Sequence, residues 1–211
     1  MSRLKMGISM SLDGYVAGPD QSLDEPLGKG GEQLHGWVFG LAAWRQPHGL
    51  EGGEVNESSV VIEEAVASAG ATIMGRNMFG GQGRWEDQQW NGWWGEDPPF
   101  HHPVFVLTHH PREPLEMQGG TTFHFVTDGI ESALRQARDA AGDKDIGLGG
   151  GAQAGQQYLN AGLLDELRID LVPVILGGGA RLLDNVGPNA KLQLAGVIDA
   201  PGVTHLTYTT R

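Results

Sequence analysis

Apolar residues along the chain fall into short runs that alternate with segments of helical periodicity. Five short runs predict strands: 4–11, 71–74, 103–108, 122–127 and 145–148. The runs 71–74 and 103–108 are expected to be buried, the second because it is rich in β-branched and aromatic residues. Between them, apolar positions recur at helical spacing before Gly70 and Gly142, and a further helix is expected to end near Gly162. This alternation is typical of an α/β protein with a mostly parallel sheet.

The last part of the chain predicts strands without intervening helices. Residues 166–173 alternate with Leu167, Ile169 and Leu171 facing inward. Residues 191–199 and 203–209 predict a closing antiparallel pair around Ala200-Pro-Gly202. We therefore expect a mostly parallel central sheet with antiparallel C-terminal strands. With 211 residues and no long polar linker, residues 1–211 are expected to form a single domain.

Polar residues at the ends of the periodic segments predict where the helices begin. Asn56 or Ser58 could cap the helix that Gly70 stops. The spacing Asp128-x-x-Glu131 predicts a capping box for the next helix, with Gly142 as its C-cap. Residues 20–57 have no clear period, although 36–44 could form a short helix.

The loop-like stretch 80–99 contains four tryptophans: Trp85, Trp90, Trp93 and Trp94. Their spacing would not place all four on one face of a helix. Two interpretations stay open. The rings could cover an edge of the core or a subunit contact, or one or two could line a pocket for a planar ligand.

Three consecutive glycines, Gly149 to Gly151, join a predicted strand to a predicted helix. Residues without a Cβ let the backbone adopt positive φ and let a ligand approach the main chain. The first N–H groups of the following helix lack partners within the helix and favour an anion. The stretch could be a structural turn, but it is also suited to binding a phosphate.

Composition limits the classes of partner. The chain has 14 Lys and Arg against 26 Asp and Glu, for a formal charge of −12, which disfavours nucleic acid. It has no cysteine, so disulfides and thiolate metal sites are excluded. No run reaches the length of a membrane span and no secretory signal is evident, so we expect a cytoplasmic protein without a membrane partner.

Several motifs, in this order, resemble the dihydrofolate reductase-like superfamily, and most closely the riboflavin-biosynthesis reductase domain and its stand-alone relatives. They are Ser11-Leu-Asp-Gly14, Met74-Gly-Arg-Asn-Met-Phe79, Val106-Leu-Thr-His-His110, Leu148-Gly-Gly-Gly151 and Leu171-Val-Pro-Val-Ile-Leu-Gly177. The resemblance covers most of the chain apart from residues 20–57 and 80–99. It implies a three-layer α/β fold and a reductase that transfers hydride from NADPH to a small heterocyclic substrate.

The resemblance also implies a set of cofactor-binding residues. Gly75, Arg76 and Asn77 would meet the cofactor phosphates at a helix start, and Thr108 and His109 would flank the 2′-phosphate. Gly149, Gly150 and Gly151, with Ala152 and Gln153, would hold the pyrophosphate. An arginine suits phosphate because its donors form a fixed fork. Because neither Arg76 nor Thr108-His109 has an acidic neighbour to bind a free 2′-hydroxyl, we expect NADPH in preference to NADH.

The substrate side is less defined. Asp13 lies near the expected nicotinamide position and is the candidate catalytic residue, although it could instead cap its own turn. No proton donor can be named among four glutamates of the unaligned region: Glu32, Glu51, Glu54 and Glu57. No metal site is expected, because adjacent histidines such as His109 and His110 cannot both face one ligand from an extended chain.

Two alternative functions remain open: a folate reductase proper, and a non-catalytic NADP-binding protein that kept the glycine turns. Folate reductases have a carboxylate on the helix after the first loop, and this chain has no residue that can be aligned with it. A homodimer is also expected, because the apolar terminal strands and the tryptophans exceed what a monomer would leave exposed. Relatives of this kind are commonly dimeric.

Overall fold

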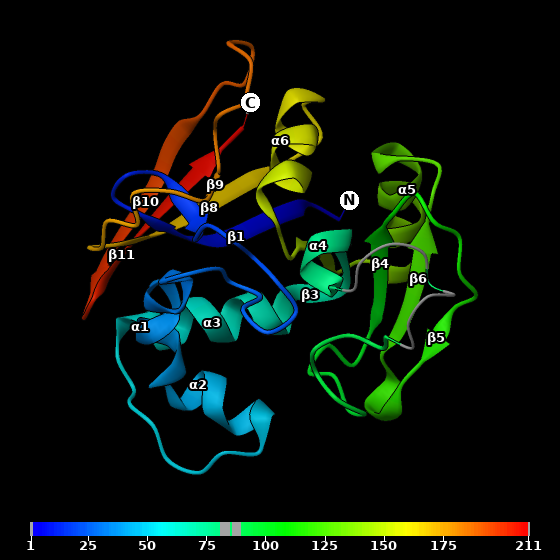
Figure 1. The fold of residues 1–211 in the computed structure, drawn as a ribbon, viewed down its shortest axis with the longest axis horizontal. Helices are drawn as coiled ribbons and strands as arrows, with labels where there is room; N and C mark the ends of the chain where they lie inside the picture. Colours follow the sequence, from blue (N-terminus) through cyan, green and yellow to red (C-terminus); the bar gives the residue numbers. More distant parts are fainter. Residues whose placement is uncertain (1, 81–84, 86–89, 211) are drawn as a thin grey trace.

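A nine-stranded sheet, ordered β10-β11-β8-β1-β7-β3-β4-β6-β5, runs through the computed structural model, which describes residues 2–80, 85 and 90–210 (Figure 1). Its strands are β1 (Leu4–Ser11), β3 (Ala69–Gly75), β4 (Pro103–Leu107), β5 (Leu115–Glu116), β6 (Thr122–Val126), β7 (Asp145–Leu148), β8 (Glu166–Val172), β10 (Gln193–Ala200) and β11 (Val203–Thr209). A small second sheet pairs β2 (Tyr15–Ala17) with β9 (Ala180–Arg181).

The helices are α1 (Gly36–Phe39), α2 (Ala42–Arg45), α3 (Glu57–Ser68), α4 (Arg76–Phe79), α5 (Ile130–Ala141) and α6 (Ala152–Asn160). Short 3-10 helices span Gly31–His35, Gln46–His48 and Gln118–Gly120. No helix in these described segments is both long and apolar enough to cross a membrane.

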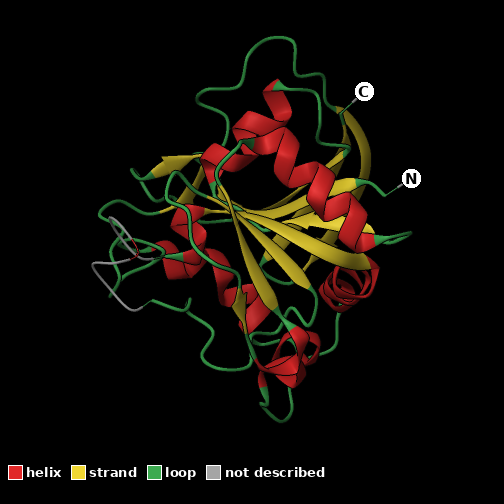
Figure 2. Ribbon diagram, turned by 90° about the vertical axis from the view of Figure 1, so that its right-hand side faces the viewer, coloured by secondary structure: helices red, strands yellow, loops and turns green. Residues whose placement is uncertain are grey.

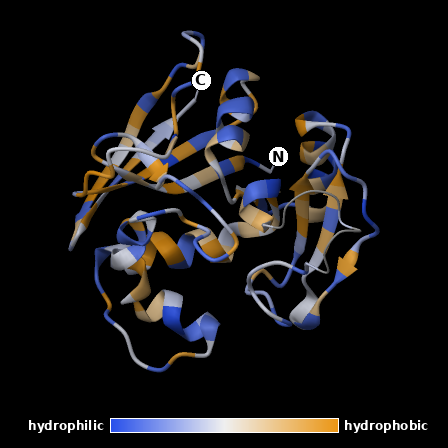
Figure 3. Ribbon diagram, in the orientation of Figure 1, coloured by the Kyte–Doolittle hydropathy of each residue, from blue (hydrophilic) through white to orange (hydrophobic). Residues whose placement is uncertain are grey.

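The strand directions confirm the predicted fold class. The six strands from β8 to β6 in the sheet order pair in parallel, whereas β10 with β11, β11 with β8 and β5 with β6 are antiparallel. Helices lie on both faces of the sheet, which makes the three layers (Figure 2). Apolar residues follow the strands, and β4 is largely apolar along its length (Figure 3).

The two faces of the sheet carry different helices. Leu4 and Met6 of β1 belong to the main core, together with residues of α5 and α6. Ser58 of α3 instead contacts β11 through His205, so α3 covers the opposite face. Successive residues of a strand point to opposite faces. Met6 therefore faces α6, and Ser9, three residues later, faces α3.

The tryptophans, all of which lie outside the undescribed residues 81–84 and 86–89, mainly cover an edge of the core, and a role in binding a planar ligand stays a prediction. Trp85, Trp90 and Trp94 pack against a second core cluster that contains Phe79 and Phe123. The indole N–H groups of Trp90 and Trp93 donate to the carbonyls of Phe79 and Met78. Most of the rings thus cover the core, while Trp93 also lines a shallow pocket described below.

Several predicted helix ends differ from the observed ones. Asn56, rather than Ser58, caps α3 by accepting from the Ser58 N–H, and α3 ends at Ser68, before Gly70. The predicted Asp128-x-x-Glu131 capping box is wrong, because α5 begins only at Ile130 and its N-cap is Gly129, without a side-chain cap. The predicted helix at 36–44 is two short helices, α1 and α2, separated at Gly40 and Leu41.

The carboxyl end of β1 separates from β7. Their pairing runs from Leu4 with Ile146 to Met6 with Leu148 and ends there. The pairing of β1 with β8, however, continues as far as Ser11 with Val172. One edge of β1 beyond Met6 is therefore no longer covered by β7. In open α/β sheets, ligands bind at the carboxyl ends of strands where neighbouring connections diverge.

Candidate functional site

The glycine turn after β7 lies against the end of β3. The Gly75 N–H donates to the Gly150 carbonyl at 2.8 Å, and the Gly149 N–H donates to the Ile73 carbonyl at 2.8 Å. Gly150 has a φ of +124°, a conformation that side chains with a Cβ rarely adopt. Gly151 is the N-cap of α6 and no side chain caps that helix. The structure thus brings Gly75 and the Gly149–Gly151 turn together.

The first residues of α6 follow directly on this turn. Ala152 is buried and Gln153 is exposed, and the first N–H groups of the helix have no partner within the helix and no side-chain cap. Asn77, in the first turn of α4, is also exposed and lines a shallow pocket of about 150 Å³. The other pocket residues are Gln21, Ser22, Leu23, Pro26, Gly80 and Trp93.

Two arginines share the ring of Trp85. The Arg76 guanidinium carbon lies 3.1 Å from the ring centroid, and that of Arg112 lies 5.2 Å from it. Burial, and then repulsion from Arg112, lower the pKa of Arg76 to about 10, so the group stays charged at neutral pH. Arg112 also donates to the Trp90 carbonyl and to the Asn91 side chain. The result is a local positive patch on an acidic protein.

Thr108 and His109 follow directly on β4, beside the end of β3. Leu107 pairs with Gly75, so Thr108 lies in the same row as Arg76 at the neighbouring strand end. The Thr108 hydroxyl accepts from the His110 N–H at 3.1 Å, and the Trp85 indole donates to the His110 carbonyl. His109 is exposed. The predicted cofactor residues on β3, β4 and α6 therefore lie on one rim of the sheet.

Asp13 fastens the turn after β1 to the loop after β8 that contains Leu176 and Gly177. Its carboxylate accepts from the Ser11 hydroxyl at 2.6 Å and from the N–H groups of Leu176 and Gly177 at 3.1 and 2.7 Å. These hydrogen bonds, that of Ser11 first, lower the pKa of Asp13, so it is a carboxylate at neutral pH. A carboxylate with these partners positions a turn and has no proton to donate. Its catalytic role stays a prediction.

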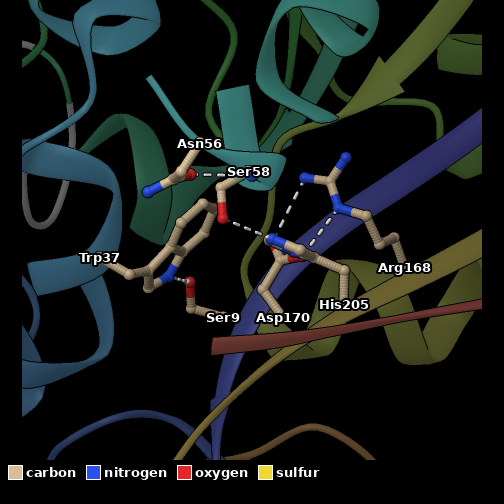
Figure 4. Close-up of polar contacts among 7 residues, drawn as sticks. All are labelled: Ser9, Trp37, Asn56, Ser58, Arg168, Asp170 and His205. Carbon is tan, nitrogen blue, oxygen red and sulfur yellow. Dashed lines mark hydrogen bonds and ion pairs between the residues drawn. The ribbon is translucent and has the colours of Figure 1, made fainter. Parts of the chain in front are cut away.

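A buried polar network that the sequence analysis did not identify lies on the α3 face of the sheet. His205 of β11 pairs with Asp170 of β8, which pairs with Ser9 of β1, so the three stand in one row across three strands. Ser58 and Trp37 cover this row from above (Figure 4). The sequence contains one signal of this network: Arg168 and Asp170 are two residues apart, and residues at this spacing share a face of a strand.

The network runs in a chain of short hydrogen bonds. The Ser58 Oγ lies 2.9 Å from His205 Nε2, and His205 Nδ1 lies 2.6 Å from an Asp170 oxygen. Arg168 donates to both oxygens of Asp170, at 2.8 and 3.2 Å. Burial by itself raises the pKa of Asp170, but the hydrogen bond from His205 and the charge of Arg168 hold it below the ordinary value. Asp170 is therefore an ionised, buried acceptor.

Gly7 of β1 makes room for this network. A Cβ at that position would lie 2.5 Å from a terminal nitrogen of Arg168. The guanidinium thus lies close over the strand where it meets Asp170. Trp37 completes the arrangement: its indole N–H donates to the Ser9 hydroxyl at 3.1 Å, and its ring meets the His205 ring edge-on at 5.0 Å between centroids.

Comparisons with known proteins give one sequence relative and several structures of the same fold. An uncharacterized protein of Bacillus subtilis, YyaP, is 33% identical over 118 residues, which are 54% of this chain and 62% of that protein. A Shewanella sp. PV-4 structure named for riboflavin biosynthesis has a TM-score of 0.63 and 21% identity, covering 99% of both chains.

Two further structures have the same fold at lower identity. A Thermotoga maritima diaminohydroxyphosphoribosylaminopyrimidine deaminase/5-amino-6-(5-phosphoribosylamino)uracil reductase is 13% identical with a TM-score of 0.56. The match covers all of this chain but 57% of that one. Enterococcus faecalis dihydrofolate reductase in complex with NADP(H) is 13% identical with a TM-score of 0.51, covering 98% and 95%.

These likenesses show a dihydrofolate reductase-like fold. A family model described as the RibD C-terminal domain matches residues 3–206, nearly the whole chain. This protein therefore belongs to the RibD C-terminal domain family.

Proposed function

We propose that this chain is a single-domain, NADPH-dependent reductase that transfers hydride to a small heterocycle of the aminopyrimidine class. The observation that carries this proposal is the separation of β1 from β7 beside the glycine turn. Beside this gap, the Gly149–Gly151 turn suits a pyrophosphate on the α6 face. The polar row of Ser9, Asp170 and His205 lies on the α3 face. Membership of a reductase-like family supports the same activity.

The cofactor side fits a dinucleotide phosphate. Gly150, with positive φ, and the uncapped start of α6 offer main-chain donors where a Cβ would interfere. Gly75 keeps the turn in place through its hydrogen bond to Gly150. Arg76 and Arg112, with Thr108 and His109 at the adjoining strand end, suit the 2′-phosphate. A bound dihydronicotinamide supplies the hydride; the chain orients it against the substrate.

The position of the substrate follows from the face of the sheet on which the cofactor binds. Phosphates at α6 put the cofactor on the α6 face, with its reactive ring entering where β1 and β7 part. A substrate that receives hydride across this opening stands on the α3 face, beside Ser9. Asp13 then acts by holding the turn after β1 to Gly177 rather than by donating a proton.

The experiment that tests this function is a screen of NADPH oxidation by the purified chain, with an assay for cofactor retained through purification. Turnover of 5-amino-6-(5-phosphoribosylamino)uracil is expected. Turnover of dihydrofolate instead would make the protein a folate reductase. Tight NADPH binding without turnover of any pyrimidine, pterin or carbonyl would make it a non-catalytic NADP-binding protein.

Replacing Arg76 with Ala is expected to weaken NADPH binding much more than NADH binding. A charge-assisted hydrogen bond contributes about 1.5–3 kcal/mol, or roughly ten- to a hundredfold in affinity. The difference between the cofactors should shrink as salt rises, because exposed charges are screened. Titration calorimetry with both cofactors at two salt concentrations measures this.

The matched control is Arg138→Ala, which removes one exposed cation from α5 and should change neither affinity. An equal loss of both cofactors in Arg76→Ala would assign Arg76 to the pyrophosphate or to the fold. A wild-type preference for NADH would contradict the proposed binding mode of the whole rim.

We also expect the protein to be a homodimer through the β10 edge. β10 ends the sheet, and Leu194, Val197 and Ile198 on it are 41–55% exposed. Sedimentation at micromolar concentration should give twice the 22.5 kDa of the chain. Val197→Asp should give the single-chain mass, and Val55→Asp, in an exposed loop, should not. A wild-type species of 22.5 kDa alone would contradict the prediction.

A further inference from the structure

We propose that Ser58 is the proton donor of the reduction, supplied through His205 and Asp170. This inference rests on the proposed function and adds the group that the sequence left unnamed. The four glutamates considered for that role, Glu32, Glu51, Glu54 and Glu57, are all exposed. In their place, the hydroxyl of Ser58 is held inside the α3 face, and the residue is 1% exposed.

The position of Ser58 follows from its helix and from the strands below it. Asn56 caps α3 by accepting from the Ser58 N–H at 2.9 Å, which fixes the first turn over the sheet. The Ser58 hydroxyl then points at His205, whose row continues through Asp170 to Ser9 of β1. Ser9 belongs to the part of β1 that has separated from β7. The Trp37 indole joins this part of β1 to the network, because its N–H donates to the Ser9 hydroxyl and its ring meets the His205 ring edge-on. A ring in the place of the indole therefore reaches from the opening beside Ser9 to the His205 end of the network.

Trp37 indicates what kind of molecule fits this place. A flat ring with one N–H donor already lies there, bonded to Ser9 and edge-on to His205 (Figure 4). An aminopyrimidine has the same features: a planar ring with N–H donors at its edge. Trp37 is only partly buried and lies on the short helix α1, where it packs against the small cluster of Leu34, Val172 and Val203 rather than the main core. In the complex, the substrate ring takes the place of the indole.

The proton transfer uses the groups of this network. The substrate carbon of a C=N or C=O bond receives the hydride, and its nitrogen or oxygen takes the proton of the Ser58 hydroxyl. Ser58 regains a proton from His205 Nε2, and His205 regains one from water before the next turnover. Asp170 stays ionised and holds the His205 Nδ1–H, which orients the ring. Arg168 keeps that carboxylate in place through two donors. Asp170 and His205 are thus positioning residues, and Ser58 is the catalytic one.

The kinetic test compares Ser58→Ala with Ser58→Thr in the full chain, with NADPH and 5-amino-6-(5-phosphoribosylamino)uracil. A general acid contributes roughly 10²–10⁴-fold. Ser58→Ala should lower the single-turnover rate of hydride transfer about a hundredfold or more, with the NADPH dissociation constant unchanged. Ser58→Thr keeps a hydroxyl and should restore most of the loss. The wild-type rate should be slower in D₂O, and this solvent effect should disappear in Ser58→Ala. If Ser58 were only structural, Ser58→Ala would leave the ratio of the rates in H₂O and D₂O unchanged.

A second measurement does not depend on turnover. The wild-type chain with NADP⁺ is titrated with 5,6-diaminouracil and followed by ¹⁵N spectra of the histidine rings and tryptophan indoles. The Trp37 N–H and His205 Nε2 signals should shift on binding, and the Nε2 shift should be absent in Ser58→Ala. Unfolding curves confirm that each variant is folded.

The outcomes separate the two proposals. Hydride transfer in Ser58→Ala at the wild-type rate would overturn the role of Ser58 and leave the reductase function standing. If the wild-type chain turns over no aminopyrimidine, the proposed substrate class is wrong. The ¹⁵N spectra then test the network around Ser58 without turnover. Shifts at Trp37 and His205 would then support a ring-binding site on this network, and unchanged signals would overturn it.

Discussion

Replacing Asp170 with Asn is expected to lower the free energy of unfolding by about 3–5 kcal/mol, the usual cost of removing one partner of a buried ion pair. The Asp170 side chain is 3% exposed, and its charge faces Arg168 and His205 at 2.6–3.2 Å. Asparagine fills the same volume but leaves the guanidinium without its counter-charge in a poorly solvated place. Denaturant unfolding should show the loss, and the melting temperature should fall by roughly 6–20 °C.

The control is Asp184→Asn, which breaks the pair of Arg181 and Asp184, whose side chains are 47% and 58% exposed. Exposed pairs contribute about 0–1 kcal/mol, so this variant should unfold almost like the wild type. An equally small effect of Asp170→Asn would contradict the claim that the buried network stabilises the fold.

The effect of Asp170 should also depend on pH. Its pKa in the folded chain is below that of the unfolded chain, about 3.9. A carboxylate of this kind contributes stability that is fully present above the unfolded pKa and is lost as pH falls through the folded pKa. The difference between wild type and Asp170→Asn should therefore be full at pH 7 and smaller at pH 3, as measured by denaturant midpoints at the two values.

Replacing Gly150 with Val should reduce NADPH affinity by about 3 kcal/mol, roughly a hundredfold, through loss of main-chain hydrogen bonds to the pyrophosphate. A valine at φ +124° is strained, and its methyl groups enter the space next to the start of α6. Stability should fall by only about 1–3 kcal/mol. Titration calorimetry and unfolding curves on the same samples separate the two losses.

Gly142→Val is the matched control. Gly142 also has positive φ, at +61°, but it lies between α5 and β7, at the amino end of β7, where a Cβ meets nothing within 4 Å. It should show a comparable loss of stability and normal NADPH affinity. If Gly150→Val folded and bound NADPH normally, the turn at Gly149–Gly151 would be structural.

Much of the fold follows from local pattern. Apolar runs of strand length predicted β1, β3, β4, β6 and β7, and clean alternation predicted the late strands, because the two-residue period of a strand is set by backbone geometry alone. The glycine turn was also readable, since three residues without Cβ between a strand and a helix have few structural explanations. The ordered motifs then indicated the family, which the match over residues 3–206 confirms.

The first residues of the helices were harder to predict, because a shift of one residue places a different side chain at the N-cap. Asp128 has the side chain of a good cap, yet α5 begins after Gly129, whose φ of +95° sets the turn instead. Residues 31–57 have no period because they form several short helices that depend on packing against the rest of the chain.

The site, by contrast, depended on contacts between distant residues. Trp85 meets Arg76 and Arg112 only because β3 and β4 are neighbours. Ser58 and His205 are 147 positions apart in sequence and 2.9 Å apart in space. Alternation along β8 placed Leu167 and Ile169 inward and left the face of Asp170 unassigned. The sequence alone determined the strands, the turns and the family. The tertiary structure decided that α3 covers the second face and turns Asp170 into a buried charge, because a local pattern cannot encode which element packs above it.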